Sequence, residues 1–280
     1  MSRDGGRPKR VRMPYVEQLA ERLSSRDWSI ISTINQLRIM SALQLERLYF
    51  HELTGRSRSV KRAQVLKRLV DVGALVSLPR RVGTANRGST KLCYALDSAG
   101  QRLLRLRSSR ESQEPRVRRP RIPSDRLTKH TLAVSELYVD LMERSQLYGF
   151  TVGDFQVEGN AYCPDGLGGW IKCDASLRLE FGTITDYWWY EADMPRHDSD
   201  FANESLPTTE GKALNYLDFV RRGQLGPDGV VPKVMFGEPT SKRCEDVNGL
   251  IDELPAPANL LFRAAKLTDV AQTMVDELMS

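Results

Sequence analysis

Three carboxylates near the middle of the chain have the residue types and spacing of a metal-dependent hydrolytic site. Asp174 lies in the half-apolar run KCDASLRL, and Glu191 and Asp193 are the two acids of YEAD. On a strand, the spacing of Glu191 and Asp193 would point both side chains to one face of the sheet. Oxygen clusters of this kind suit Mg²⁺, which could activate water for phosphodiester cleavage. We therefore take Asp174 and Glu191 as candidate metal ligands.

The elements predicted around these acids follow the order α-β-β-β-α-β. Apolar spacing predicts a helix from about Thr128, followed by three strands at 151–157, 171–179 and 187–192. A second helix at 209–221 and a last strand at 231–236 come next. This order matches the core of the PD-(D/E)xK, or restriction-endonuclease-like, fold, in which the second and third strands bring carboxylates together at one sheet edge. We expect residues 127–240 to form such an α/β domain.

The expected site differs from those nucleases at its lysine. They usually carry a lysine two residues after the glutamate, where it stabilises charge on the attacked phosphate, but this chain has Asp193 there. Lys212, on the next helix, is the best substitute, and Lys172 is the second; Glu136 is a further candidate acid. The candidate catalytic set is therefore Asp174, Glu191, Asp193 and Lys212. Without a lysine the fold could persist as a non-catalytic module, so the sequence leaves enzyme activity open.

The charge of the chain is divided at one boundary. Residues 1–126 hold 28 Lys and Arg against 11 Asp and Glu, whereas residues 127–280 hold 13 against 25, so the overall +5 hides a net of +17 and a net of −12. Each Lys or Arg that contacts a phosphate releases counterions and so promotes binding to nucleic acid. The first part of the chain is thus predicted to bind a polyanion.

The pattern of residues 25–107 indicates how that binding would work. A helix capped by Asp27, a helix capped by Ser41, a basic helix that stops at Gly73, and strands at 74–78 and 91–96 follow one another. This is the order of a winged helix-turn-helix, an α+β fold whose third helix enters the major groove. The predicted DNA contacts are Arg56, Arg58, Lys61, Arg62, Lys67 and Arg68 on that helix, and Arg80, Arg81 and Arg87 in the Gly-rich wing loop. An α+β domain with a solvated charged face, or a protein-contact module, is the alternative.

The remaining segments connect or flank these two domains. Residues 1–24 are expected to be a basic arm with a lead-in helix, and the Pro- and Arg-rich residues 108–126 a linker. Residues 241–280 are expected to be a tail with one helix at 268–279, which could pack on the core or on a second copy in a homodimer.

Composition excludes several classes of protein. No apolar run approaches a membrane span or a signal peptide, so we expect a cytoplasmic protein without a membrane partner. The four cysteines form no C-x-x-C pair and there are only three histidines, so neither a disulfide framework nor a zinc cluster is supported. We expect no required cofactor, and Mg²⁺ only if the acidic site is active.

Taken together, the segments RDWSIISTINQLRIMSALQLERLYF, KHTLAVSELYVDL, KCDASLRL, YEAD and GKALNYLDFV resemble the replication-relaxation family of plasmids, integrative elements and phages. The resemblance covers roughly residues 25–240. It implies a winged helix and a restriction-endonuclease-like domain with a motif PDA, then E-x-D, then a helix with K and Y. Cys173 replaces the proline of PDA, whereas Asp174, the E-x-D acids and Lys212 are retained.

Two further residues match the family pattern, namely His130 at the start of the domain's first helix and Tyr216 on the helix of Lys212. A lone histidine near a helix start is more often a cap or a core contact than a ligand, so we expect a structural role for His130 and also for Tyr216. The resemblance implies work on DNA of mobile elements, in replication, plasmid relaxation or transcriptional control.

Three functions remain open at this point. The chain could be a double-stranded DNA binder, a metal-dependent endonuclease or nickase recruited by its winged helix, or an adaptor that contacts a replication or transfer protein through its acidic domain. Because residues 127–280, which include that domain, carry −12, this part of the chain would repel DNA unless a metal neutralised it.

Overall fold

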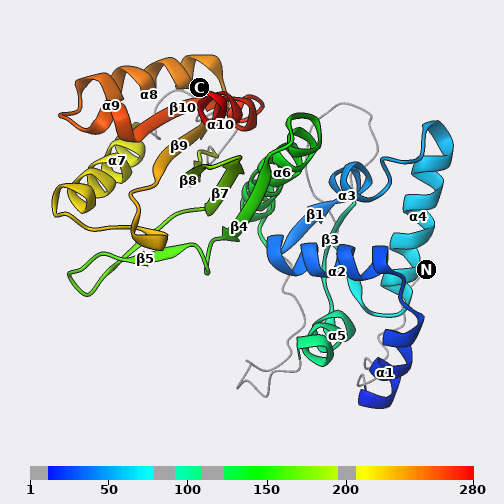
Figure 1. The fold of residues 1–280 in the computed structure, drawn as a ribbon. Coiled ribbons are helices and arrows are strands. Elements are labelled where there is room, and N and C mark those ends of the chain that lie inside the picture. Colours follow the sequence, from blue (N-terminus) through cyan, green and yellow to red (C-terminus); the bar gives the residue numbers. More distant parts are fainter. Residues whose placement is uncertain (1–11, 79–91, 109–122, 195–205) are drawn as a thin grey trace. The chain divides into compact units, whose positions relative to one another are not determined.

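The computed structural model describes residues 12–78, 92–108, 123–194 and 206–280 and divides into two compact units, Met1–Pro123 and Ser124–Ser280 (Figure 1). Both mix helices with sheet. The first unit contains α1 (Met13–Arg22), α2 (Ser25–Leu37), β1 (Ile39–Ser41), α3 (Ala42–Tyr49), α4 (Gly55–Asp71), β2 (Leu75–Leu78), β3 (Cys93–Leu96) and α5 (Ser98–Ser108). Its three strands form an antiparallel sheet in the order β1-β3-β2.

Helix α2 begins one turn earlier than the sequence pattern predicted. Its N-cap is Ser24, whose hydroxyl accepts from the Asp27 amide, while the Asp27 carboxylate accepts from the Ser24 amide at 2.9 Å. Asp27 is therefore the third residue of a capping box and not the cap itself. It is fully buried, and it forms an ion pair with Arg68 of α4 at 2.5 Å. The Asp27 carboxylate thus takes part in capping the N-terminus of α2 and also connects α2 to α4.

Helices α3 and α4 begin and end largely as predicted. Ser41 caps α3 in a second capping box, with Gln44 as its partner. Helix α4 ends before Gly73, which has a φ of 73° in the left-handed region that glycine adopts at least cost. The predicted wing residues Arg80, Arg81 and Arg87 lie outside the described residues, as does most of the predicted linker.

The second unit is built on a five-stranded sheet. Its elements are α6 (Asp125–Tyr148), β4 (Thr151–Val157), β5 (Tyr162–Pro164), β6 (Trp170–Lys172), β7 (Ala175–Phe181), β8 (Ile184–Ala192), α7 (Leu206–Arg221), a 3-10 turn (Pro227–Gly229), β9 (Lys233–Glu238), α8 (Ser241–Glu253), α9 (Ala258–Leu261), β10 (Phe262–Lys266) and α10 (Val270–Met279). The strand order is β10-β9-β8-β7-β4, antiparallel from β4 to β8 and parallel from β8 to β10. Helix α6, strands β4, β7 and β8, helix α7 and strand β9 follow the predicted order α-β-β-β-α-β.

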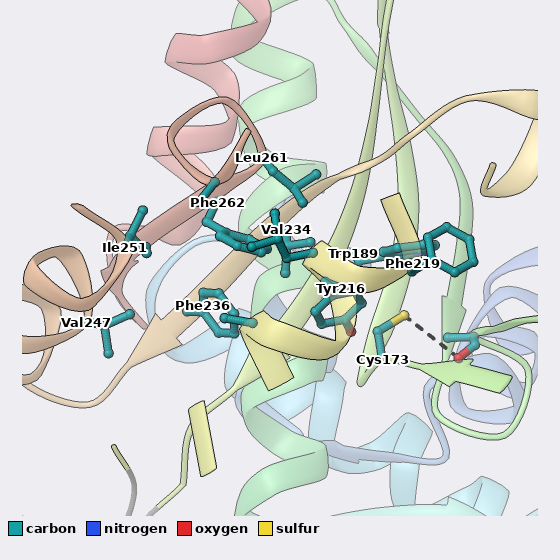
Figure 2. Packing of buried hydrophobic residues seen from close by; sticks show 14 residues of the cluster. Cys173, Trp189, Tyr216, Phe219, Val234, Phe236, Val247, Ile251, Leu261 and Phe262 are labelled. Atoms are coloured by element: carbon teal, nitrogen blue, oxygen red, sulfur yellow. Dashed lines mark hydrogen bonds between the residues drawn. The ribbon is translucent and has the colours of Figure 1, made fainter. Parts of the chain in front are cut away.

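Aromatic packing fixes α7 against the sheet. Trp189 of β8 lies 5.2 Å from Tyr216 and 5.6 Å from Phe219, both on α7, measured between ring centroids. Phe236 of β9 contacts Phe262 of β10 at 5.8 Å, so the cluster continues across the sheet (Figure 2). These side chains are almost completely buried. The position of α7, and of every polar group it carries, is therefore set by this core.

Two predicted elements differ from those observed. The strand predicted at 171–179 is two strands, because Cys173 and Asp174 separate β6 from β7, where the Cys173 amide donates to the Ala161 carbonyl. The segment 241–280, expected to be a tail with one helix, supplies α8, α9 and β10 as well as α10. Strand β10 pairs in parallel with β9, and its Phe262 is buried in the core. Among the described residues, every helix is too short or too polar to cross a membrane.

Candidate functional site

Glu191 is the most enclosed residue of the predicted acidic set. It lies next to the end of β8, is 3% exposed, and uses both carboxylate oxygens in contacts with α7. Lys212 donates to Oε2 and the Tyr216 hydroxyl donates to Oε1, each at 2.5 Å. Tyr216 is held by the aromatic packing against Trp189, so the core positions the hydroxyl that binds this acid (Figure 2).

Asp174 lies beside Glu191, directly before β7. Its Oδ2 accepts from the Ala192 amide at 2.8 Å, and its Oδ1 is 3.1 Å from His130 Nε2. His130 comes from α6, so three elements, α6, the start of β7 and the end of β8, meet at this carboxylate. The structure thus brings together Asp174, Glu191 and Lys212, along with the two residues for which we expected structural roles.

Asp193 forms its ion pair outside this group. It follows β8, and its carboxylate lies 3.3 Å from Nη2 of Arg243, a buried residue of α8. The Nε of Arg243 is 3.5 Å from Glu238 at the end of β9, and both Glu238 oxygens are buried without a hydrogen-bond partner among the described residues. Asp193, Arg243 and Glu238, the Arg243 triad, are a second ionic cluster beside the first.

Burial and charge determine which of these groups are ionised. Burial, together with the neighbouring Asp174 charge, raises the pKa of Glu191 to about 7, although Lys212 opposes the shift. The hydrogen bond to Asp174 raises the pKa of His130, and burial only partly opposes it. Burial acts to raise the pKa of Asp174, but its hydrogen bond and ion pair with His130 hold it below the usual value. Burial raises the pKa of Glu238 to about 8.

The arrangement is that of an internally neutralised polar cluster. Asp174 and Glu191 accept hydrogen bonds from protein donors through all four of their oxygens. Consistent with this, no group of three His, Cys, Asp or Glu side chains in the described part of the chain is arranged to hold a metal ion. The residues present therefore do not fit Mg²⁺ in this arrangement. Of the other candidates, Lys172 ends β6 and lines the same cleft as Lys212, and Glu136 lies farther along α6.

The basic helix α4 has two cationic faces with different partners. Arg58 and Arg62 point to α3, where both pair with Glu46, at 3.6 and 2.6 Å. Lys61 and Arg68 lie about two turns apart on another face of α4. Together with Arg26, at the start of α2, they line a cleft of about 590 Å³. Gln64 adds an amide to that cleft.

The remaining predicted contacts on α4, Arg56 and Lys67, belong to neither of these two groups. Lys67 pairs with Asp71 on the same helix at 2.5 Å. Arg56 and Lys61 form no ion pair with any residue that the structure describes. Of the six α4 cations predicted to contact DNA, these two are therefore the ones without a counter-charge among the described residues.

We expected structural roles for His130 and Tyr216, but the sequence did not predict which groups they contact. Both matched the resemblance, and each contacts one of the candidate acids directly. Arg243 and Glu238 had no sequence signal, because α8 was expected to be part of a tail and Glu238 was not recognised as the end of a strand.

Comparison with known proteins adds one finding. A protein-family model described as Replication-relaxation matches residues 31–234, a span that runs from α2 into β9. No curated protein and no solved structure matched the chain.

Proposed function

The chain belongs to the replication-relaxation family, and from this premise we propose that it is a double-stranded DNA-binding protein of a plasmid, integrative element or phage. It acts in replication or relaxation of that element, or in its transcriptional control. In this proposal the first unit is a winged helix-turn-helix and the second a restriction-endonuclease-like domain that has lost or reduced its catalysis.

The observation that carries the proposal is the cleft between α2 and α4. Lys61, Gln64 and Arg68 follow one another at helical spacing on α4, and Arg26 faces them from α2. Arg26 pairs with Glu52 and Arg68 pairs with Asp27, so Lys61 is the cation of the cleft that can contact a backbone phosphate without giving up an ion pair. The Gln64 amide can read a base edge in the major groove. The order of α2, α3 and α4 before the antiparallel pair β2–β3 supports the winged-helix assignment.

A specific observation also favours a nuclease as the second candidate. Asp174, Glu191 and Lys212 converge at the end of one sheet, which is where a phosphodiester-cleaving site of this fold would lie. Against it, each carboxylate oxygen is occupied by a protein donor, and Asp193 stands where the usual lysine would be. We expect weak cleavage or none. The adaptor function rests on the acidic net charge alone and ranks third.

The proposal is tested by titrating the full-length protein with duplex DNA over a range of salt concentrations. Because cationic contacts to phosphate release counterions, the logarithm of affinity should fall steeply with the logarithm of salt concentration, by about 0.9 for each phosphate contacted. An affinity that does not change with salt, or the absence of binding at low salt, would refute the proposal.

A further inference from the structure

The β5–β6 hairpin presents two aromatic rings to solvent. Cys163 and Ile171, which pair across the hairpin, pack against the hydrophobic core. Because side chains alternate along a strand, Tyr162 and Trp170 lie on the opposite face, where they are 53% and 52% exposed and contact one another edge to face at 4.9 Å. Trp170 is the only one of the four tryptophans left so exposed. Core packing does not account for it.

A cleft of about 330 Å³ lies beside Trp170, between the hairpin and α7. Its walls include Trp170, Lys172, Lys212, Asn215, Tyr216 and Arg222, together with the carboxylates Asp165 and Asp218. This volume is within the range that binds small ligands, and it is large enough for a nucleotide unit. Through Lys212 and Tyr216 the cleft reaches the contacts of Glu191.

The cleft carries positive charge that the protein leaves available. Lys172 is exposed and forms no ion pair with the described residues, and the Lys212 side chain is 41% exposed although it pairs with Glu191. Arg222, by contrast, pairs with Asp218 at 2.9 Å. Lys172 and Lys212 are thus the cations that this cleft presents, within a segment, 127–280, whose net charge is −12.

Trp170 and Lys172 lie two residues apart on the same face of β6. An exposed aromatic ring beside an ammonium group suits a nucleotide of a single strand. A nucleobase stacks on the ring while the adjoining phosphate pairs with the ammonium group. In a duplex the bases are stacked on one another and cannot reach such a ring. We propose that this cleft binds an unpaired DNA strand, with a base on Trp170 and its phosphate on Lys172. The identification of the strand as DNA rests on the proposed function, whereas its unpaired state follows from Trp170.

Binding would also act on the buried cluster. A phosphate that reaches Lys212 would compete with Glu191 for the same ammonium group, which now lies 2.5 Å from the carboxylate. The cleft therefore couples strand binding to the Lys212–Glu191 ion pair.

The test measures binding of a fluorescein-labelled oligothymidine to the full-length protein by fluorescence anisotropy. Trp170→Ala should weaken binding about tenfold or more, because one stacked base is lost, and Trp170→Phe should retain most of the affinity. Leu167→Ala, at a hairpin residue that is 76% exposed, is the matched control and should leave affinity unchanged. Lys172→Gln should lower the salt dependence by about 0.7, unlike Lys242→Gln on α8.

Each outcome decides between the claims. If Trp170→Ala leaves oligothymidine affinity unchanged, or weakens duplex binding equally, the inference is wrong. Tighter binding of oligouridine of the same length would overturn the assignment to DNA. If the wild type binds oligothymidine through Trp170 but does not bind duplex, the proposed duplex function fails and the cleft stands. Duplex binding combined with oligothymidine binding that is independent of Trp170 removes the cleft and leaves the proposed function.

Discussion

Tyr216 connects the hydrophobic core of the second unit to the acidic cluster around Glu191. Its ring packs on Trp189, and its hydroxyl donates to the buried Glu191. A buried carboxylate that loses a donor keeps its desolvation penalty without compensation. The geometry of the cluster is therefore part of the folding energetics of the second unit, whatever chemistry it supports.

Tyr216→Phe should destabilise the protein by about 1 to 3 kcal/mol, because it leaves one Glu191 oxygen without its partner. Tyr187→Phe is a matched control, since the Tyr187 hydroxyl also donates to a carboxylate, Asp228, but at an exposed site. The control should cost less than about 0.5 kcal/mol. Denaturant unfolding measures both, and equal effects would contradict the account.

Glu238 provides a pH-dependent prediction. Its pKa is about 8 in the folded protein and near 4.5 in the unfolded chain, so the folded state holds the proton more tightly. The contribution of Glu238 to the free energy of unfolding should therefore be fully present below about pH 4.5 and should be lost as the pH rises towards 8. Each unit of raised pKa corresponds to about 1.4 kcal/mol.

Glu238→Gln removes this titration. Relative to the wild type, the variant should become more stable by at least about 1 kcal/mol as the pH is raised from about 5 to about 9. The measurement is the free energy of unfolding of both proteins across that range. A difference that stays constant with pH would show that Glu238 is already ionised in the folded protein.

Residue types and spacing could predict which acids come together in the site, but not which side chains pair with them. The acids of KCDASLRL and YEAD were predicted on neighbouring strands, with Lys212 on the helix that follows, so their convergence was predictable. That Glu191 would be fully paired by Lys212 and Tyr216 depends on how α7 packs over Trp189. Likewise, the ion pair of Asp193 depends on Arg243, which reaches it only through the tertiary position of α8.

At the scale of elements, α4 has two cationic faces that make different contacts. One face holds α3 through Glu46, and the other opens on the cleft with Lys61 and Gln64. Periodicity predicted a basic helix, but could not say which of its charges had partners, because Glu46 and Asp27 lie on other helices.

Arg62→Ala and Lys61→Ala, adjacent on α4, should therefore have opposite phenotypes. Arg62→Ala breaks a half-buried pair with Glu46 and should lower the free energy of unfolding by about 1 kcal/mol, with little direct effect on duplex affinity. Lys61→Ala should leave stability unchanged within about 0.5 kcal/mol and weaken duplex binding. Chemical unfolding and anisotropy on the same pair check this, and the reverse pattern would contradict the assignment of the faces.

Strand prediction succeeded where side chains alternate or form an apolar run, and failed elsewhere. Thr151–Val157 was predicted with the bounds that β4 has. Strand β10, with the sequence FRAAK, lacks β-branched residues, and its place in the sheet comes from pairing with β9. Strand β1 has only three residues, and its pairing with β3 defines it.

At the scale of the whole molecule, the opposite charges of the two parts suggest a division of labour. The first part, at +17, is suited to duplex DNA, whereas the second, at −12, is unsuited to it, and the Trp170 cleft is proposed to take an unpaired strand. This division of charge is consistent with the proposal that the first part binds duplex DNA and that the second has lost or reduced its catalysis.

Supercoiled plasmid incubated with the full-length protein and Mg²⁺ or Mn²⁺ should remain largely uncut, because protein donors occupy the oxygens of Asp174 and Glu191. Gel electrophoresis separates nicked, linear and supercoiled forms. Metal-dependent nicking that Glu191→Ala abolishes would contradict this expectation and make the nuclease the better function.

The central claim is that duplex DNA is bound by the unpaired cations of α4, and one measurement tests it most directly. The salt dependence of duplex affinity should be compared between the wild type, the double variant Arg56→Gln with Lys61→Gln, and the control Lys242→Gln with Lys266→Gln, which removes the same charge from the second unit. We predict that the first double variant lowers the slope by about two, one for each lost phosphate contact, while the control keeps the wild-type slope. Equal slopes in all three proteins, or a loss confined to the control, would contradict the account.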